Sequence, residues 1–441
     1  MLSFVFVLTV QHVMINLFGK NAKAEGEKMK LKREGVTRRE FLKDVAAAGT
    51  GMAALGVPAP ARALGANDRI RMALIGCGGR GSYVFSIFRN NPDVDVIAVC
   101  DVYEPRRLEQ QQLSGPQTQA YADYHEVLDR KDVDAVLIAT PNHWHKQVLI
   151  DAVHAGKDAY CEKPIMHSIE EGVEMVKAVQ ETGRVVQTGT QQRSWPHWIL
   201  GKQLVADGIL GDVYLIHTYW YQDYVGRRDW FAKQAIDTSK LNWKMWLGDA
   251  PDQPFTKEKY IYWRFYWDFG GGILTDLLTH WIDAIQWYQD QTAPMTATTT
   301  GDLYFMNWQC PDTITAAYEY PGKFNVTFTG VLNSSIDAGG IAFRGTKATL
   351  KIDRAHLAVY PEGIPRQPYK EYPEAEIYIR SEHDGTIDHV RNFLDCVRSR
   401  KVPNAGIQVG FEAARASLIG NIALKRGLKT VWDAAAQKVL S

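Results

Sequence analysis

The sequence predicts an α/β fold: an N-terminal domain with a parallel sheet, followed by an α+β domain with an open, mostly antiparallel sheet. Three observations predict it. Short apolar runs alternate with helical patterns over the first domain, a glycine-rich turn follows the first run, and beyond Thr292 the runs become β-rich and alternating. The expected parts are a signal region at 1–64, a first domain at 65–190 and a second domain at 191–441.

The composition is that of an ordinary globular chain. Of 441 residues, 46% are hydrophobic and 23% are charged, and Lys plus Arg equal Asp plus Glu at 50 each. The lack of a basic excess argues against a general nucleic-acid binder and against a polybasic membrane-surface protein. The five cysteines are widely spaced and form no C-x-x-C pair, so we expect neither a disulfide framework nor a metal site.

Residues 1–64 have the features of a twin-arginine (Tat) export signal. Arg38 and Arg39 precede a weakly apolar stretch from Val45 to Val57, and Ala61-Arg62-Ala63 is an A-x-A cleavage pattern. We therefore expect export by the Tat machinery to the periplasm and no transmembrane segment in the mature chain. The alternative is an amphipathic helix that contains an arginine pair by chance.

A second apolar stretch, Leu2 to Phe18, lies upstream of the arginines. It is short and interrupted by polar residues, which argues against a membrane anchor. Signals of this kind normally start a few residues before the arginine pair, so Met29 would be a conventional start residue. We therefore expect 1–28 to be a misassigned extension.

A glycine-rich turn follows the first apolar run, Ile70 to Ile75. It reads Gly76-Cys77-Gly78-Gly79-Arg80-Gly81, opens a helical pattern from Ser82 to Arg89, and precedes an acidic residue, Asp101, by 20 positions. This context is typical of a Rossmann dinucleotide-binding domain, where the glycines allow a tight turn, approach of the pyrophosphate and close helix–strand packing. Free N–H groups at the helix start would bind the phosphates. The alternative is a tight turn without a ligand.

Asp101 lies at the end of the second apolar run, Val94 to Cys100. A carboxylate there accepts hydrogen bonds from the ribose hydroxyls and repels a 2′-phosphate. The sequence therefore favours NAD over NADP as cofactor, although Arg106 and Arg107 lie close enough to weaken that preference.

Polar segments follow the later strands of the expected parallel sheet, where ligands of such sheets bind. These segments are Thr140-Pro141-Asn142-His143-Trp144-His145, Glu162-Lys163-Pro164 and Thr190-Gln191-Gln192-Arg193. Pro164 blocks continuation of the strand, so Lys163 is presented to the cofactor crevice rather than being an ordinary solvated charge. The residues expected to contact the cofactor are Gly76, Gly78, Gly79, Arg80, Gly81, Asp101, Thr140, Pro141, Asn142, His145, Glu162, Lys163 and Gln191.

The second half begins with an aromatic-rich region. Between Tyr219 and Trp267, 15 of 49 positions are aromatic, against 11% for the whole chain. Most of these rings would be core, and an exposed subset would suit the C–H faces of a sugar. The candidates for that subset are Trp220, Tyr221, Trp230 and Trp263.

Three glycines, Gly270 to Gly272, open a helical segment that runs to about Gln289. Asp276 and His280 are four residues apart and would share one helix face among apolar neighbours. On a buried helix such a pair is either a structural brace or a functional site, and spacing leaves both readings open. Just upstream, Arg264 and Asp268 would bind substrate hydroxyls or pair with each other.

Together these motifs, in this order, resemble the Gfo/Idh/MocA family of glucose–fructose oxidoreductases and inositol dehydrogenases. The resemblance covers residues 68–430 and rests on the glycine loop, Pro141-Asn142-His143, Glu162-Lys163-Pro164 and Asp276-x-x-x-His280. It implies NAD(P), a sugar, polyol or related substrate, and a second domain that often forms an oligomer interface. We therefore expect a homo-oligomer, a dimer or tetramer. Exported members are known, some with tightly held cofactor.

The resemblance places Lys163, Asp276 and His280 in the catalytic group. Chemistry agrees: His280 would take the hydroxyl proton as hydride leaves, Lys163 would stabilise the alkoxide, and Asp276 would orient the substrate or raise the basicity of the histidine. The residues expected to contact the substrate are Lys163, Arg193, Tyr221, Arg264, Asp276 and His280.

The expected activity is that of an exported NAD(P)-dependent oxidoreductase acting on a secondary alcohol of a sugar, polyol or glycoside. Two alternatives stay open. One is an NAD-dependent, redox-neutral glycosidase that oxidises, eliminates, hydrates and reduces again; the retained Asp276 argues for the dehydrogenase. The other is a non-catalytic sugar or cofactor carrier, since export would place the protein where little free NAD exists.

Overall fold

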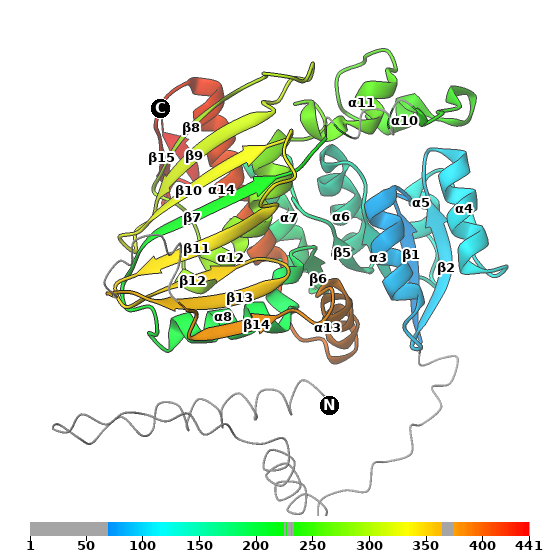
Figure 1. Cartoon of the computed structure of the whole chain (residues 1–441). Coiled ribbons are helices and arrows are strands. Elements are labelled where there is room, and N and C mark those ends of the chain that lie inside the picture. The colour runs from blue at the N-terminus through cyan, green and yellow to red at the C-terminus, as the bar shows by residue number, and fades with distance from the viewer. Residues whose placement is uncertain (1–68, 225, 227–230, 232, 364–373, 441) are drawn as a thin grey trace, which may run out of the picture. The chain divides into compact units, whose positions relative to one another are not determined.

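The computed structural model of the chain describes residues 69–224, 226, 231, 233–363 and 374–440 (Figure 1). The expected Tat signal, its cleavage pattern and the alternative start at Met29 lie outside the described residues. Among the residues that are described, no helix is both long and apolar enough to cross a membrane.

The first domain is built on a six-stranded parallel sheet with the strand order β3-β2-β1-β4-β5-β6. This confirms the predicted Rossmann architecture, in which the order reverses beside β1. Its strands are β1 (Ile70–Ile75), β2 (Val94–Cys100), β3 (Gln119–Tyr121), β4 (Ala135–Ile138), β5 (Asp158–Cys161) and β6 (Val186–Thr188). Its helices are α3 (Gly79–Arg89), α4 (Glu104–Ser114), α5 (Tyr124–Leu128), α6 (His145–His154) and α7 (Ile169–Thr182).

Local sequence explains where these elements begin and end. The continuous apolar runs of β1 and β4 are buried almost throughout, as expected for central strands of a parallel sheet. Helix α7 starts with a capping box between Ser168 and Glu171 and ends at Gly183 in the left-handed conformation. The strand ends that carry the candidate site are therefore fixed by short-range signals.

The second domain contains a ten-stranded sheet with the order β14-β13-β12-β11-β7-β10-β9-β8-β15-β16. All neighbours are antiparallel except β7 and β10, which confirms the predicted open, mostly antiparallel sheet. The strands are β7 (Val213–Tyr221), β8 (Thr296–Asp302), β9 (Thr313–Glu319), β10 (Asn325–Val331), β11 (Gly339–Gly345), β12 (Ala348–Ile352), β13 (His356–Pro361), β14 (Ile377–Arg380), β15 (Thr430–Asp433) and β16 (Lys438–Leu440).

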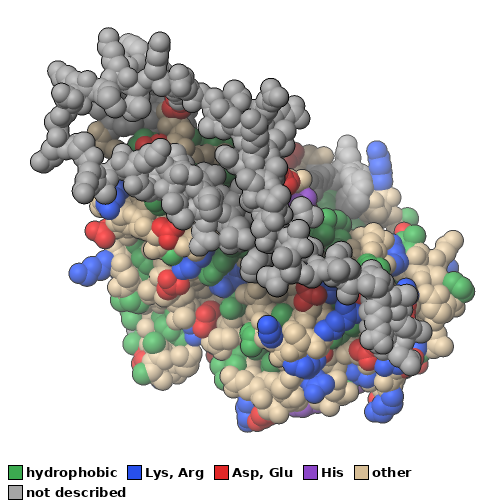
Figure 2. All heavy atoms as spheres, turned by 90° about the horizontal axis from the view of Figure 1, so that it is seen from below, with side chains coloured by type: hydrophobic (Ala, Val, Ile, Leu, Met, Phe, Trp, Pro, Cys, Tyr) green, Lys and Arg blue, Asp and Glu red, His purple; other side chains and the backbone are tan. Residues whose placement is uncertain are grey.

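Helices cover one face of this sheet (Figure 1): α8 (Pro196–Ala206), α12 (Thr279–Gln289) and α14 (Ile407–Arg426). Their core includes the stacked rings of Trp198 and Trp281, whose centroids are 5.6 Å apart. Along β8, β9 and β10 buried and more exposed residues alternate, so the other face of these strands is open. On the face seen in Figure 2, acidic and basic side chains are interspersed where they are not covered by grey atoms.

Helix α13 (Thr386–Ser399) returns from the second half of the chain to the first domain. Phe393 packs edge-to-face against Phe88 of α3 and Tyr160 of β5, with centroids 5.9 Å away in each case. His389 on the same helix lies close to the Thr188 carbonyl, 2.8 Å from Nε2, and to the Ser194 hydroxyl, 2.7 Å from Nδ1. The first domain thus uses a helix that the predicted boundary at residue 190 assigns to the second.

The buried His389 predicts a loss of stability in mild acid. Burial lowers its pKa from 6.5 to about 4. Between these values the unfolded chain binds a proton that the folded chain does not, so the free energy of unfolding falls as pH drops from 6.5 towards 4. The slope that one such group contributes is at most about 1.4 kcal/mol per pH unit.

Urea unfolding at several pH values measures this slope. The His389→Gln variant should show a shallower slope than the wild type, although its stability at neutral pH will be lower. His154→Gln, which removes an exposed imidazole at the end of α6, is the matched control. An unchanged slope in His389→Gln would contradict the prediction.

Candidate active site

A cavity of about 610 Å³ lies at the carboxyl ends of the parallel strands and is lined by residues of both domains. Most of the candidate residues from the sequence line it. They are Gly76, Gly78, Gly79, Arg80, Asp101, Thr140, Pro141, Asn142, His145, Glu162, Lys163, Gln191, Arg264, Asp276 and His280.

The glycine loop forms the first wall of this cavity. Gly76 has φ +96, and a Cβ there would lie 2.7 Å from the backbone of Ala139. A Cβ on Gly81 would lie 2.1 Å from the Gly76 carbonyl oxygen, so only glycine lets α3 pack this closely on the loop. Helix α3 begins at Gly79 with no acidic residue in its first turn, which leaves its free N–H groups available to phosphate. This cradle fits a dinucleotide.

Asp101 holds the loop and the end of β2 together. Its two carboxylate oxygens accept hydrogen bonds from the backbone N–H groups of Cys77 and Tyr103, both at 2.8 Å. Burial raises the pKa of this carboxyl, opposed by the charge of Arg106. Each oxygen keeps a second lone pair, so the carboxylate can still accept hydrogen bonds from a ribose.

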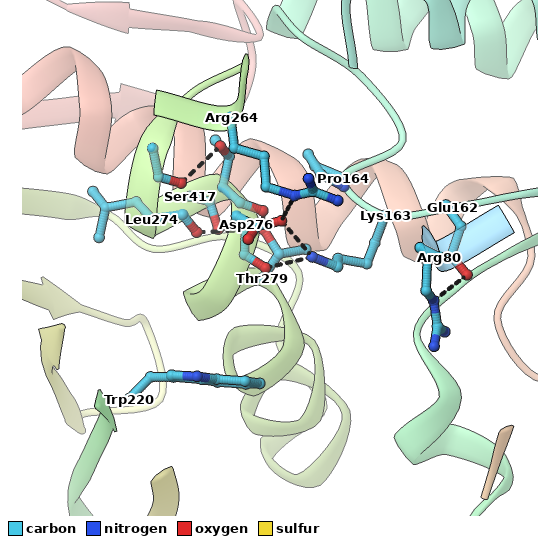
Figure 3. Close-up of polar contacts among 12 residues, drawn as sticks. Arg80, Glu162, Lys163, Pro164, Trp220, Arg264, Leu274, Asp276, Thr279 and Ser417 are labelled. Atoms are coloured by element: carbon cyan, nitrogen blue, oxygen red, sulfur yellow. Dashed lines mark hydrogen bonds and ion pairs between the residues drawn. The ribbon is translucent and has the colours of Figure 1, made fainter. Parts of the chain in front are cut away.

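Arg80 and Glu162 form an ion pair on the cavity wall, with Nε and Oε1 2.9 Å apart (Figure 3). The other polar ends of this pair, Arg80 Nη2 and Glu162 Oε2, are buried without a hydrogen-bond partner in the described part of the chain. Buried polar atoms are normally satisfied, so this pair is suited to groups of a bound ligand.

Lys163 and Arg264 converge on one carboxylate, Asp276 (Figure 3). The Lys163 ammonium donates to Asp276 Oδ1 at 2.9 Å and to the Asp276 carbonyl at 2.5 Å, and Arg264 Nε donates to the same Oδ1 at 3.1 Å. Burial alone would raise the pKa of Asp276, but the two cations outweigh it and hold the pKa below 3.8. Burial lowers the pKa of Lys163 below 10.5, and Asp276 only partly opposes this shift.

His280 lines the same cavity as this ion cluster and forms no ion pair with a described residue. Its ring stacks on Trp220 with centroids 5.5 Å apart, and its Nδ1 is buried without a hydrogen bond to any described residue. Burial lowers its pKa well below 6.5, and the charge of Lys163 adds to the shift. The imidazole is therefore neutral at physiological pH.

This geometry corrects one expectation for Asp276, that it raises the basicity of His280. The carboxylate is committed to Lys163 and Arg264 instead. The two side chains do line the same cavity, as their spacing predicted, and residues Leu274–Leu278 form a π-helix there. Arg264 likewise does not pair with Asp268, which accepts a hydrogen bond from Gln253.

Arg193 and Tyr221 were expected to contact the substrate, but neither lines the cavity. Gly81, expected to contact the cofactor, does not line it either and acts by letting α3 pack on the glycine loop. Arg193 binds the buried carboxylate of Asp283 at 2.8 Å and so ties the first domain's last loop to α12. Tyr221 follows Trp220 on β7, and strand alternation directs it away from the cavity towards Tyr219, 5.2 Å between centroids. Trp263 does line the cavity, whereas Trp230 lies outside the described residues.

Sequence reasoning missed Arg354, which lines the cavity from the short turn between β12 and β13. Its guanidinium lies over Trp220, with Cζ 4.8 Å from the ring centroid. Nothing in the local sequence marks this arginine, because its position depends on how the second sheet packs beside α12.

Residues 233–262, named here the cover segment, leave the second domain and contact the first near the end of β2. They include α10 (Trp243–Leu247) and α11 (Lys257–Ile261) (Figure 1). The Asn242 N–H donates to the Val102 carbonyl at 3.1 Å, and the Trp144 indole donates to the Trp246 carbonyl at 2.8 Å. Aromatic residues of the cover segment, Trp246 and Tyr260 among them, line the cavity on this side.

Comparison with protein families agrees with this arrangement. Residues 70–190 match the family model described as "Oxidoreductase family, NAD-binding Rossmann fold" of the GFO_IDH_MocA set. Residues 248–417 match its companion, "Oxidoreductase family, C-terminal alpha/beta domain". The two matches cover the glycine loop, Lys163, Asp276, His280 and Arg354.

Curated relatives are distant. The chain is 26% identical over 295 residues to the 2,7-anhydro-N-acetylneuraminate hydratase of Mediterraneibacter gnavus, covering 64% of this chain and 66% of the relative. It is 28% identical over 154 residues to the inositol 2-dehydrogenase of Salmonella paratyphi B, covering 34% and 46%. The matches thus span about half to two thirds of these relatives' lengths.

Among solved structures, the WlbA dehydrogenase of Bordetella pertussis, determined in complex with NADH and UDP-GlcNAcA, superposes with a TM-score of 0.61. The identity is 18%, and the superposition covers 82% of this chain and 98% of that one. At this identity the likeness shows a shared fold.

The packing of Gly81 predicts that Gly81→Ala impairs both folding and nucleotide binding. The new methyl group would meet the Gly76 carbonyl at 2.1 Å, so the loop must move. We expect the free energy of unfolding to fall by about 1–3 kcal/mol and affinity for added NADH to fall at least about tenfold.

Gly79→Ala is the matched control for folding, because nothing lies within 4 Å of a Cβ at that position. Urea unfolding and quenching of tryptophan fluorescence by NADH measure the two effects. Wild-type stability and affinity in Gly81→Ala would refute the assigned packing role.

Proposed function

The chain belongs to the Gfo/Idh/MocA oxidoreductase family, and we propose that it transfers hydride between a secondary alcohol of a carbohydrate and a nicotinamide dinucleotide. The observation that carries the proposal is the position of Lys163, Asp276 and His280. They line the same cavity as the glycine loop and Asp101, so a reacting alcohol and a dinucleotide would share one space. The substrate class proposed is a sugar, polyol or glycoside, in keeping with the names of the relatives.

We propose NAD rather than NADP as the cofactor. Gly76, Gly78 and the start of α3 would hold the pyrophosphate, and Asp101 would hold the ribose hydroxyls. When bound, NAD supplies the hydride acceptor or donor. Arg106 is the cation whose charge acts most on Asp101, so it is the residue expected to weaken this preference; its guanidinium lies over the ring of Tyr260 with Cζ 5.1 Å from the centroid.

The chain's own residues would move the proton. His280 is neutral and so is able to accept the proton of the substrate hydroxyl; with Nδ1 enclosed by protein, Nε2 is the nitrogen open to a ligand. Lys163 has three N–H bonds and uses two on Asp276. The third can donate to the reacting oxygen and stabilise negative charge there. Asp276 and Arg264 fix the lysine in place.

The cover segment supports a further proposal, that the nucleotide is retained between turnovers. Its contacts with Val102, Tyr103 and Trp144 lie beside the part of the cavity where the adenosine would bind. A retained cofactor also favours a second candidate function, a redox-neutral reaction in which the nucleotide is reduced and reoxidised on one substrate. The relative named a hydratase is consistent with that reaction class.

Export by the Tat pathway to the periplasm and assembly into a dimer or tetramer remain proposals. The first rests on the arginine pair at Arg38 and Arg39. The second rests on the open face of the ten-stranded sheet, where Tyr378 is 56% exposed.

One experiment separates these functions. The absorbance and fluorescence of purified protein are recorded before and after addition of each member of a panel of sugars and glycosides. Reduction of the nucleotide by a sugar supports the dehydrogenase. Release of aglycone without accumulated NADH supports the redox-neutral enzyme. Bound nucleotide that no substrate changes supports a cofactor carrier, and a protein that never binds NAD contradicts the dehydrogenase, the redox-neutral enzyme and the cofactor carrier.

The proton-transfer roles predict that His280→Ala and Lys163→Ala each lower turnover at least about a hundredfold. The pH profile adds a signature that a purely structural role would not give. Because burial lowers the pKa of His280 well below 6.5, the acid limb of kcat/KM should lie below pH 6.5; because burial lowers the pKa of Lys163, the alkaline limb should lie below 10.5.

Stopped-flow measurement of nucleotide reduction across pH tests both roles. In His280→Ala the acid limb should vanish from the residual rate, while far-UV circular dichroism stays native. Near-wild-type turnover in either variant removes that residue from the mechanism.

Retention of the nucleotide predicts a difference between two substitutions of Asn242. Its side chain caps α10 by accepting from Met245 N–H, and its backbone N–H donates to Val102. Asn242→Ala loses the cap alone, whereas Asn242→Pro loses the cap and the backbone donor. We expect nucleotide to dissociate at least about fivefold faster from the proline variant than from the alanine variant.

Dissociation is followed by transferring each loaded protein to nucleotide-free buffer and trapping released NADH with a dehydrogenase. Equal rates for the two variants would show that this contact does not hold the cover segment closed.

A further inference from the structure

Arg354 lines the cavity and forms no ion pair with a carboxylate in the part of the chain that the structure describes. Its side chain is exposed, its guanidinium lies over the face of Trp220, and it makes no hydrogen bond or ion pair with any described residue. The acid that acts on it most is Asp384, which lies outside the cavity lining. That carboxylate is already hydrogen-bonded to Tyr83 and Thr386. Arg354 is therefore a cation whose five donors are available to a ligand.

The charge balance of the cavity also favours an anionic ligand. Among described residues, five cations line it and three carboxylates oppose them. The cations are Arg80, Arg106, Lys163, Arg264 and Arg354, and the carboxylates are Asp101, Glu162 and Asp276. Oxidised NAD has two phosphate charges and one pyridinium charge, a net charge of about −1. Cofactor binding would thus leave an excess of positive charge.

The location of this excess is the substrate end of the cavity. Arg80 is paired with Glu162, and Arg264 and Lys163 share the single charge of Asp276, so one positive charge remains in that cluster and Arg354 adds a second that no described carboxylate pairs with. Arg354 and His280 both lie against the same indole ring, that of Trp220. Its charge also reaches the base, since it contributes to the low pKa of His280. A sugar with its reacting carbon at His280 would have a neighbouring substituent near Arg354.

We propose that the substrate is an anionic carbohydrate, whose carboxylate or phosphate is bound by Arg354 while its alcohol lies at Lys163 and His280. The guanidinium fork matches both kinds of anion in a bidentate manner. This inference rests on the proposed function, because that function places the reacting alcohol in the same cavity.

The structure explains why a neutral sugar would be the poorer ligand. The free guanidinium loses solvent when a ligand fills the cavity, and enclosure by protein already lowers its pKa from 12.5 to about 10. A neutral ligand desolvates this charge and returns no compensating charge. An anion returns a charge-assisted hydrogen bond, which favours it at the level of both affinity and specificity.

Equilibrium binding to the NAD-loaded protein tests the proposal without requiring turnover. Tryptophan fluorescence follows titrations with D-glucuronate and D-galacturonate, with their neutral partners D-glucose and D-galactose, and with D-glucose 6-phosphate. We expect at least one anionic sugar to bind about tenfold or more tightly than its neutral partner. Arg354→Gln should abolish that preference, and Arg354→Lys should keep part of it because the charge remains but the fork is lost.

Arg380→Gln is the matched control. Arg380 is an exposed arginine at the end of β14 and does not line the cavity, so its loss should leave the preference unchanged. Equal binding of anionic and neutral sugars by the wild type, or a preference that survives in Arg354→Gln, overturns the proposal. If glucose 6-phosphate is preferred and the uronates are not, the anion site stands with phosphate as its group.

Nucleotide reduction, recorded in the same samples, separates this inference from the proposed function. Anion binding through Arg354 without reduction by any sugar supports the site and counts against the dehydrogenase. Reduction by neutral sugars together with no anion preference supports the dehydrogenase and overturns the anion site.

Discussion

The arrangement of the site depends on one requirement: the buried ammonium of Lys163 needs a counter-ion. The lysine is presented at the end of β5 by the first domain, and its counter-ion, Asp276, comes from the second. Side chains of the pair are only 12% and 11% exposed, so neither charge is well solvated by water. Removing one member of such a pair leaves an uncompensated buried charge, at a cost of about 3–5 kcal/mol. The same contact therefore joins the domains and positions the proposed catalytic lysine.

This constraint also determines the state of His280. With Asp276 committed to two cations, the histidine has no carboxylate to stabilise its protonated form, and the surrounding positive charges disfavour it. A neutral imidazole next to a fixed ammonium is a suitable arrangement for taking a proton from an alcohol whose oxygen the ammonium stabilises. Because Asp276 pairs with Lys163 and not with His280, the lysine stays charged to stabilise the oxygen and the histidine stays neutral to accept the proton.

The sequence predicted what short-range signals determine. The glycine loop, the acidic end of β2 and the Glu162-Lys163-Pro164 strand end fall close to where periodicity and turn chemistry put them, because each depends on a few neighbouring residues. The parallel pairing of β7 with β10, the return of α13 to the first domain and the position of Arg354 depend on contacts between distant segments. Tyr221 shows the same limit for a single residue. It neighbours Trp220 on β7, and because adjacent residues of a strand point to opposite faces, Trp220 lines the cavity and Tyr221 does not. The spacing of Asp276 and His280 likewise predicted a shared cavity but not the partners of the carboxylate, Lys163 and Arg264, which come from distant or non-helical segments.

Enclosure links the remaining features of the site. The cover segment closes one side of the cavity with aromatic side chains and backbone hydrogen bonds, and this limits water around whatever binds there. Charges interact more strongly when water is excluded, so the Lys163–Asp276 pair and the free Arg354 gain influence over a bound ligand. The same closure that would slow nucleotide release would therefore strengthen recognition of an anionic sugar. On this view, cofactor retention and substrate choice are two consequences of a single packing arrangement, and weakening the cover segment should alter both together.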